Sequence, residues 1–178
     1  MILTLQDAQA INANVKQEDL DAYETAIREL TNNNFQNFNI RASNLSLTGK
    51  TITAASGSTT GMRQGDTIEI NETKYNDGLY TIESLTDTTI TVTSARDFIT
   101  ETAKEAIVTL IQYPADIKRG VRKLIEYDAK MADKIGVKSE TISRMSVTYY
   151  DVNATDNTEG YPKALLDFIH KYEKLRWE

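Results

Sequence analysis

The spacing of hydrophobic residues predicts two helices at the start of the chain. From residue 17 to residue 31, apolar side chains recur at intervals of three and four, as on one face of an α-helix. These positions are Leu20, Tyr23, Ile27 and Leu30. A shorter helix is expected over residues 5–11, with Thr4 as its N-cap. The three asparagines at 32–34 are expected to end the longer helix, because their side chains compete for backbone hydrogen bonds.

Beyond the asparagines, apolar and polar residues alternate with a period of two, which predicts β-strands. Of the 23 threonines, 16 lie between residues 36 and 115, and a β-branched residue suits a strand better than a helix interior. The Asn-Asp-Gly sequence at 76–78 predicts a tight hairpin turn. The expected strands are 40–47, 51–54, 67–70, 79–85, 89–93 and 106–112. Five or six short strands make a small antiparallel barrel or sandwich.

Two Tyr-Pro pairs mark the start of further helices. Pro114 and Pro162 are each expected to open an amphipathic helix, because the first turn does not need the N–H that proline lacks. Apolar residues follow both prolines at the same three offsets, so we expect these helices to pack face to face. Between them, Gly136 is expected to end the first helix, Ser139 to start a short helical turn and 146–150 to form a strand.

Together these patterns predict an α+β protein. Residues 1–35 and 114–178 are expected to form a discontinuous helical domain, a small bundle, and residues 36–113 an inserted β domain.

Composition excludes several kinds of chemistry. The 178-residue chain has no cysteine and one histidine, His170, so it has no thiolate nucleophile and no pair of imidazoles. The formal net charge of −6 argues against coating nucleic acid with the whole surface. The first residues contain no basic leader, and about 18 consecutive apolar residues occur nowhere, so neither a signal peptide nor a membrane span is expected.

Two loops match ligand-binding motifs only in part. The glycine-rich stretch 57–65 lacks the Gly-Lys-Ser/Thr ending of a phosphate-binding loop, which favours a plain connection between strands. Residues 151–160 place oxygen ligands at alternate positions, but Asp156 stands where a calcium-binding EF-hand needs glycine. A mobile, solvated loop is the expectation for this second stretch. We expect no cofactor, no bound metal and no enzyme activity.

The order of short motifs in the C-terminal part resembles a known family. A helix is followed by Gly-Val-Lys-Ser-Glu-Thr-Ile-Ser at 136–143, Met-Ser-Val-Thr-Tyr at 145–149, a polar loop, Tyr-Pro at 161–162 and a last helix. This order resembles the head-tail connector proteins, also called adaptor or head-completion proteins, of long-tailed bacteriophages and related prophages. The resemblance covers residues 5–31 and 114–177. Such connectors are usually compact helical proteins, so the β block is a departure from the family pattern.

The resemblance implies a structural neck protein of the virion, assembled in the host cytoplasm. It implies a dodecameric ring that sits on the portal protein, extends the DNA channel and meets the next neck or tail-completion protein. Genomic DNA would touch the ring only in passing through its lumen, and no membrane is involved. An inserted β domain would decorate the outside of the ring.

Two sets of residues are candidates for contacts in such an assembly. Aromatic residues anchor interfaces, and the C-terminal helix carries more apolar residues than one buried stripe needs. The candidate portal or partner interface comprises Leu166, Phe168, Tyr172, Leu175 and Trp177, with Tyr149 and Tyr150. The candidate basic patch, for a partner or the lumen, comprises Lys118, Arg119, Arg122 and Lys123. Alternatively, these cations form a solvated helix face paired with acids such as Glu126.

A second function of a different class is also open. The β block, rich in Thr, Asn and Tyr, could carry a carbohydrate- or protein-binding site of a phage particle on Tyr75, Tyr80 or Tyr113.

Overall fold

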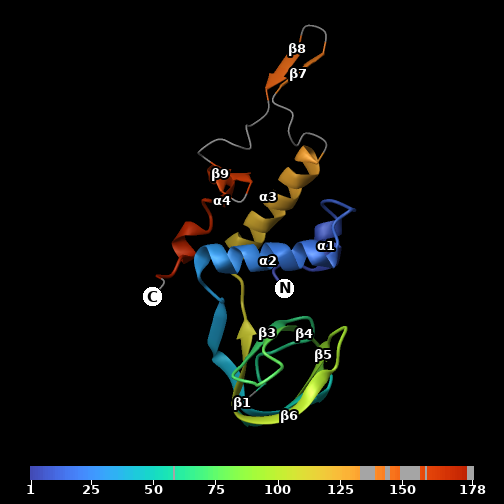
Figure 1. Cartoon of the computed structure of the whole chain (residues 1–178), viewed down its shortest axis with the longest axis vertical. Helices are drawn as coiled ribbons and strands as arrows, with labels where there is room; N and C mark the ends of the chain where they lie inside the picture. Colours follow the sequence, from blue (N-terminus) through green and yellow to red (C-terminus); the bar gives the residue numbers. More distant parts are fainter. Residues whose placement is uncertain (58, 133–138, 143–144, 149–156, 159, 176–178) are drawn as a thin grey trace. The chain divides into compact units, whose positions relative to one another are not determined.

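The computed structural model describes residues 1–57, 59–132, 139–142, 145–148, 157–158 and 160–175. The chain divides into two compact units. Residues 34–112 form the barrel unit, to which Met1 is also assigned, and residues 2–33 with 113–178 form the helical unit (Figure 1). The protein is of the α+β class, and most of its regular structure is sheet.

The elements follow the expected order along the chain. The helices are α1 (Leu5–Gln9), α2 (Gln17–Thr31), α3 (Ala115–Met131), α4 (Lys163–Leu166) and the 3₁₀ turn η1 (His170–Tyr172). The strands of the barrel unit are β1 (Gln36–Gly49), β2 (Thr51–Gly57), β3 (Thr67–Asn71), β4 (Gly78–Leu85), β5 (Thr89–Thr93) and β6 (Phe98–Ile111). Short strands of the helical unit are β7 (Ser139–Ile142), β8 (Met145–Thr148), β9 (Asn157–Thr158) and β10 (Tyr161–Pro162).

The barrel unit is a closed, antiparallel barrel with strand order β1-β2-β5-β4-β3-β6. All six predicted strands are confirmed, and the first and last are longer than expected. Closure depends on this length, because β1 pairs with both β2 and β6. The β1–β6 ladder shifts register at three places, one of them beside Asn44, which has a φ of 56°. Such bulges bend long strands enough to close a sheet on itself.

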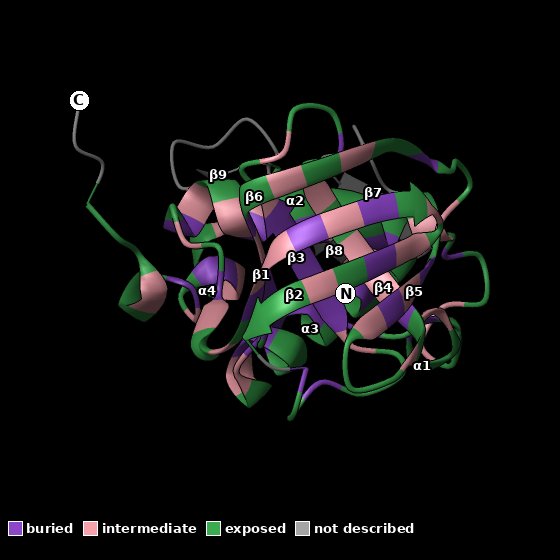
Figure 2. Ribbon diagram, turned by 90° about the horizontal axis from the view of Figure 1, so that it is seen from below, coloured by how far each residue is buried: buried purple, intermediate pink, exposed green. Residues whose placement is uncertain are grey.

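Alternating burial along the strands fills the barrel with aliphatic side chains (Figure 2). Fully buried members include Leu45, Leu47, Ile52, Ile68, Ile70, Ile82, Ile90, Val92 and Val108. Gly57, at φ +86°, lies opposite Ala42 in the β1–β2 ladder, and a Cβ on it would come within 2.7 Å of the Ala42 Cα. The pairing of β3 with β4 is confirmed, but residues 72–77 connect the two strands, so the tight turn expected at 76–78 is not formed. The buried Asn76 side chain of this connection accepts from the N–H of Ile99 and donates to its C=O, at 2.9 Å each.

The helical unit is built on α2 and α3, whose bounds agree with the sequence pattern. Helix α2 ends at Asn32, which has the left-handed φ of 48° that asparagine tolerates. Helix α3 begins after Pro114 and buries Ile117, Val121 and Leu124, as expected. Within the described residues, no helix combines the length and the apolar character that crossing a bilayer requires.

Two expectations about the C-terminal part are wrong. After Pro162, a single helical turn, α4, is followed by turns, by η1 and by extended chain, so the described part of the last segment is not one long helix. The expected helical bundle is therefore not formed, since only α2 and α3 among the described helices have seven or more residues. The physical reason is a set of tertiary hydrogen bonds to backbone groups of this segment, described below, which compete with helix formation.

The other wrong expectation concerns Ser139, where a helical turn was predicted. Residues 139–142 instead form β7, which pairs antiparallel with β8. The β-branched residues of β7 and β8, Thr141, Ile142, Val147 and Thr148, favour an extended ladder over one isolated helical turn. The predicted helix end at Gly136 and the polar loop 151–156 lie outside the described residues.

Candidate functional site

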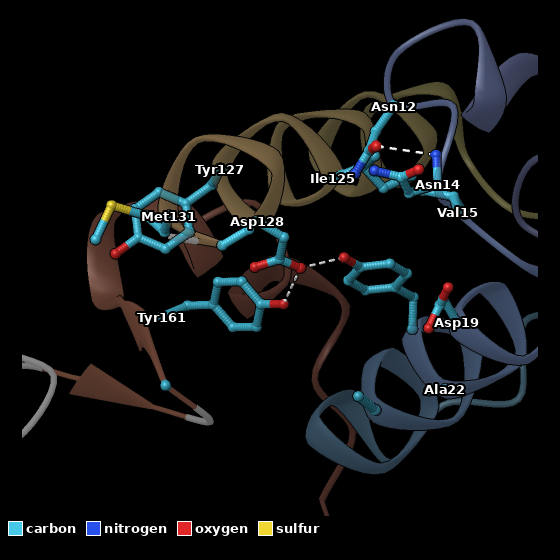
Figure 3. A pocket seen from close by; sticks show the side chains of 14 residues that line it. Asn12, Asn14, Val15, Asp19, Ala22, Ile125, Tyr127, Asp128, Met131 and Tyr161 are labelled. Carbon is cyan, nitrogen blue, oxygen red and sulfur yellow. Dashed lines mark hydrogen bonds between the residues drawn. The ribbon is translucent and has the colours of Figure 1, made fainter. Parts of the chain in front are cut away.

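A pocket of about 690 Å³ lies within the helical unit, between α2 and α3. The loop after α1 and the start of β10 complete its wall (Figure 3). Ala22 and Ala26 of α2 and Ile125 and Met131 of α3 supply apolar surface, and Asp19 lies on the wall. An apolar concavity with a few polar groups is the usual form of a binding site.

Two tyrosines and one carboxylate form the polar centre of this pocket. Figure 3 shows Asp128 of α3 beside Tyr161 of β10, and Tyr23 of α2 also contacts this carboxylate. Both tyrosine hydroxyls donate to the same oxygen, Oδ2 of Asp128, and the Tyr161 bond measures 2.6 Å. The ring of Tyr127 packs against that of Tyr161 with centroids 5.9 Å apart. The pocket centre is therefore aromatic and carries one negative charge.

Burial, together with the adjacent Asp128 carboxylate, raises the pKa of Tyr23 and of Tyr161 far above the ordinary value of 10.0. Both hydroxyls thus stay protonated at neutral pH and remain hydrogen-bond donors. This arrangement fixes the carboxylate but does not resemble an acid–base pair, because the two donors hold their protons. Within the described residues, no three His, Cys, Asp or Glu side chains gather closely enough to hold a metal ion.

The four residues of the candidate basic patch lie together on the exposed side of α3. Arg122 pairs with Asp7 of α1 at 3.9 Å, with both side chains about half exposed. Lys118, Arg119 and Lys123 form no ion pair with the described part of the chain. Since α3 turns about 100° per residue, Arg119 and Lys123 point away from the buried face that carries Val121.

Three residues of the candidate partner interface fold back onto the helical unit. Leu166 is buried, and the Phe168 ring lies over Gly120, so close that a Cβ there would come within 2.3 Å of ring atoms. The Tyr172 hydroxyl donates to Asp116 at the start of α3 with a distance of 2.7 Å. These side chains anchor the C-terminal segment: Leu166 is buried, and Phe168 and Tyr172 are half-buried.

The rest of that interface set is placed differently. Leu175 is 78% exposed, the highest exposure among the exposed large hydrophobic residues that the structure describes. Trp177, Tyr149 and Tyr150 lie outside the described residues. His170 is exposed and lies 2.6 Å from a carboxylate oxygen of Glu173. Of the four members of this set that the structure describes, Leu175 is the one with a largely exposed side chain.

Polar side chains at the end of α2 hold the C-terminal segment in place. The Asn32 amide donates to the Leu175 carbonyl at 3.1 Å, and the Asn33 amide donates to the Tyr172 carbonyl at the same distance. The Lys174 N–H donates to the Thr31 carbonyl at 2.8 Å. The asparagine run therefore has a second role, beyond ending α2, that sequence reasoning did not anticipate.

An acid at the start of α3 completes this anchor. Hydrogen bonds from Lys171 and Tyr172 lower the pKa of Asp116 from 3.8 to about 2. The same contacts raise the pKa of Lys171 and of Tyr172. Asp116 is consequently ionised, and Lys171 charged, throughout the physiological range.

The tyrosines of the alternative binding module do not come together. Tyr75 is 55% exposed on the barrel unit, whereas Tyr80 packs edge-on against Phe98 at a centroid distance of 5.0 Å. Tyr113 belongs to the helical unit, where its buried hydroxyl donates to Glu24 at 2.8 Å. Burial, followed by the Glu24 charge, raises the pKa of Tyr113 well above its ordinary value. Only Tyr75 of the three is available to a ligand.

Sequence reasoning missed the tyrosine–aspartate centre of the pocket. Tyr23 was interpreted as part of an apolar stripe, Tyr161 only as the residue before Pro162, and Asp128 was not considered. A signal was present, however, because Asp128 continues the face of α3 that carries Val121, Leu124 and Ile125, and a carboxylate on a buried face needs partners. No protein-family model matches the chain, and a search of curated proteins gives no match.

Proposed function

We propose that the protein is a structural head-tail connector of a bacteriophage neck. In this proposal, several copies form a ring on the portal protein, extend the DNA channel and join the filled head to the tail. The ring has no enzyme activity, and genomic DNA passes through it without being bound as a ligand. The next neck or tail-completion protein docks on its other end.

The observation that carries the proposal is the distribution of the motifs over the two units. Every motif of the connector resemblance lies in residues 2–33 or 113–178, which are the two parts of the helical unit. The barrel unit intervenes as a closed insertion whose ends meet, since the Gln112 N–H donates to the Phe35 carbonyl at 2.9 Å. A helical connector interrupted by a self-contained barrel accounts for both the resemblance and the departure from it.

The surface of the helical unit supports a role in assembly. Its C-terminal segment is anchored by Asn32 at the end of α2 and by Asp116 at the start of α3. The anchored segment presents the exposed side chain of Leu175. Tyrosines, a carboxylate and a cluster of exposed cations are chemistry suited to recognising another protein surface. The alternative, a barrel that binds carbohydrate or protein, has less support because Tyr80 and Tyr113 are engaged in packing and hydrogen bonding.

Native mass spectrometry over rising protein concentration, alone and with the portal protein of the same phage, tests the proposal. The expected result is a closed ring, either unaided or on the portal, with saturable and stoichiometric capture. A chain that stays monomeric and ignores the portal contradicts the proposal. In that case, binding of glycans or virion proteins through the barrel becomes the function to test, with Tyr75→Ala as the variant.

A further inference from the structure

The helical unit carries a positive surface and a negative pocket that face in different directions. The positive surface, called here the basic face, consists of the exposed Lys118, Arg119 and Lys123 of α3. The negative one, called here the tyrosine–aspartate pocket, is the cavity centred on Asp128. Among the described residues of the same copy, no acid forms an ion pair with the basic face, and no cation forms one with Asp128.

The pocket has the chemistry to accept a cationic side chain. Among the described residues, the hydrogen bonds to Asp128 all go to Oδ2, which leaves Oδ1 available to an incoming N–H donor. The ring of Tyr161 lies beside this carboxylate, and Asp19 adds a second negative charge on the wall. A guanidinium or ammonium group is attracted both to a carboxylate and to the face of an aromatic ring.

The basic face, in turn, needs a negative partner. Arg119 and Lys123 are four residues apart on one helix, so they are neighbours of like charge, which destabilises an isolated helix by a few tenths of a kcal/mol. Arg122 is neutralised by Asp7, but the three members of the basic face have no ion pair in the described part of the chain. A clustered charge without local compensation is best explained by a partner that supplies it.

We propose that Arg119 and Lys123 of one copy dock into the tyrosine–aspartate pocket of a second copy. This contact rests on the proposed function, because it supplies the joint between neighbouring subunits of a ring. A second copy is the favoured occupant because the same chain carries both halves of the complementary pair, and a ring requires them on one chain.

The direction of the two surfaces determines the kind of assembly. Each member of the Arg119–Lys123 pair is two residues from Val121, which places it about 200° around α3 from the buried face to which Asp128 belongs. The basic face and the pocket therefore lie on opposite sides of this helix. A contact between such surfaces is head-to-tail, and head-to-tail contacts close into rings when the rotation between subunits permits.

Two complementary full-length variants test the contact. Arg119→Glu with Lys123→Glu destroys the basic face but keeps the pocket, and Asp19→Asn with Asp128→Asn removes the pocket's charge but keeps the basic face. Neither variant should self-associate. Mixed together, they should form a 1:1 complex that grows no further, visible by native mass spectrometry. The control Lys50→Glu with Lys104→Glu makes the same charge change on exposed barrel residues and should behave as wild type.

Assembly on the portal separates the contact from the proposed function. We expect the wild type and the control to load cooperatively, and each contact variant to need a roughly 10- to 100-fold higher concentration for half-saturation. If the wild type loads but both variants load equally well, the contact is wrong and the connector function stands. If the wild type neither loads nor forms rings, the connector function fails, and the absence of a 1:1 complex in the mixture then overturns the contact as well.

Other occupants of the two surfaces give different results. If the basic-face variant alone loses portal capture while the pocket variant is unaffected, the basic face meets the portal and the contact between copies is refuted. If the basic-face variant forms normal rings but loses binding to duplex DNA, the face is a nucleic-acid surface, which equally refutes it. Should the pocket variant fail to fold by circular dichroism, the basic-face variant decides the test, since both its substitutions lie on exposed positions.

Discussion

Replacing Gly120 by alanine tests how the C-terminal segment is held on α3. A Cβ at this position would lie 2.3 Å from two atoms of the Phe168 ring, so the ring has to move by more than 1 Å to reach ordinary contact. Overpacking of this kind costs about 1–3 kcal/mol. Alanine in a helix interior gains about 1 kcal/mol over glycine. We therefore expect a net destabilisation of the helical unit by roughly 0–2 kcal/mol, with the unfavourable part confined to the docking of the segment.

The sign should reverse when the ring is removed. In a Phe168→Ala background nothing bulky faces Gly120, so the helix propensity alone remains and Gly120→Ala should stabilise by up to about 1 kcal/mol. The double-mutant cycle then gives a coupling free energy of about 1–3 kcal/mol between the two positions. A purely local effect on α3 has no such coupling.

Hydrogen–deuterium exchange followed by mass spectrometry is the suitable assay. The protein has two compact units, so a single denaturation curve mixes two transitions, whereas exchange reports the opening of each segment. Peptides covering 163–175 should exchange faster in Gly120→Ala, and peptides from the barrel unit serve as the internal reference. Equal gains in protection from Gly120→Ala in both backgrounds would falsify the packing of Phe168 on this face.

Three further predictions concern the anchor, the barrel and the insertion. Because the pKa of Asp116 is lowered from 3.8 to about 2, the stabilisation of the docked segment by its carboxylate is complete above about pH 4 and is lost as the pH falls toward 2. NMR shifts of the segment over a pH series should show this loss. Asp116→Asn should weaken docking at pH 7 and abolish the pH dependence. Asn76→Ala leaves the backbone groups of Ile99 without these partners, and hydrogen exchange of peptides from the barrel unit should show a loss of about 2 kcal/mol in the opening free energy. A short Gly-Ser linker in place of residues 34–112 should leave helical circular dichroism and portal capture intact, and a folded deletion chain that no longer binds the portal contradicts the connector proposal.

The barrel could be predicted because its information is local. Alternating apolar and polar residues and a high threonine content predict each strand, and Gly, Asn or Asp predicts each turn. The six strands could therefore be predicted from the sequence. The choice between barrel and sandwich did not follow. It depends on the register shifts between β1 and β6, and the sequence marks the bulge beside Asn44 with nothing more than one asparagine.

The last segment shows the opposite case, in which tertiary contacts override a helical pattern. Leu165, Ile169 and Tyr172 have helical spacing. However, the side-chain amides of Asn32 and Asn33 donate hydrogen bonds to backbone carbonyls near the end of the segment. Such bonds join residues about 140 positions apart, and no local pattern encodes them. A weak local preference gives way because a short helix is only marginally stable without packing.

The tyrosine–aspartate pocket depends both on a local sequence pattern and on tertiary contacts. Its three polar members come from α2, α3 and β10, and hydrogen bonds across 105 and 33 residues bring them together. The identity of the tyrosine partners could not be predicted. That Asp128 needs hydrogen-bond partners could be predicted, because it extends the buried face of an amphipathic helix. Among the described residues, both donors to that carboxylate bind one oxygen, Oδ2. The other oxygen keeps its capacity to accept, so a charge that the fold has already satisfied can still bind a cation from outside.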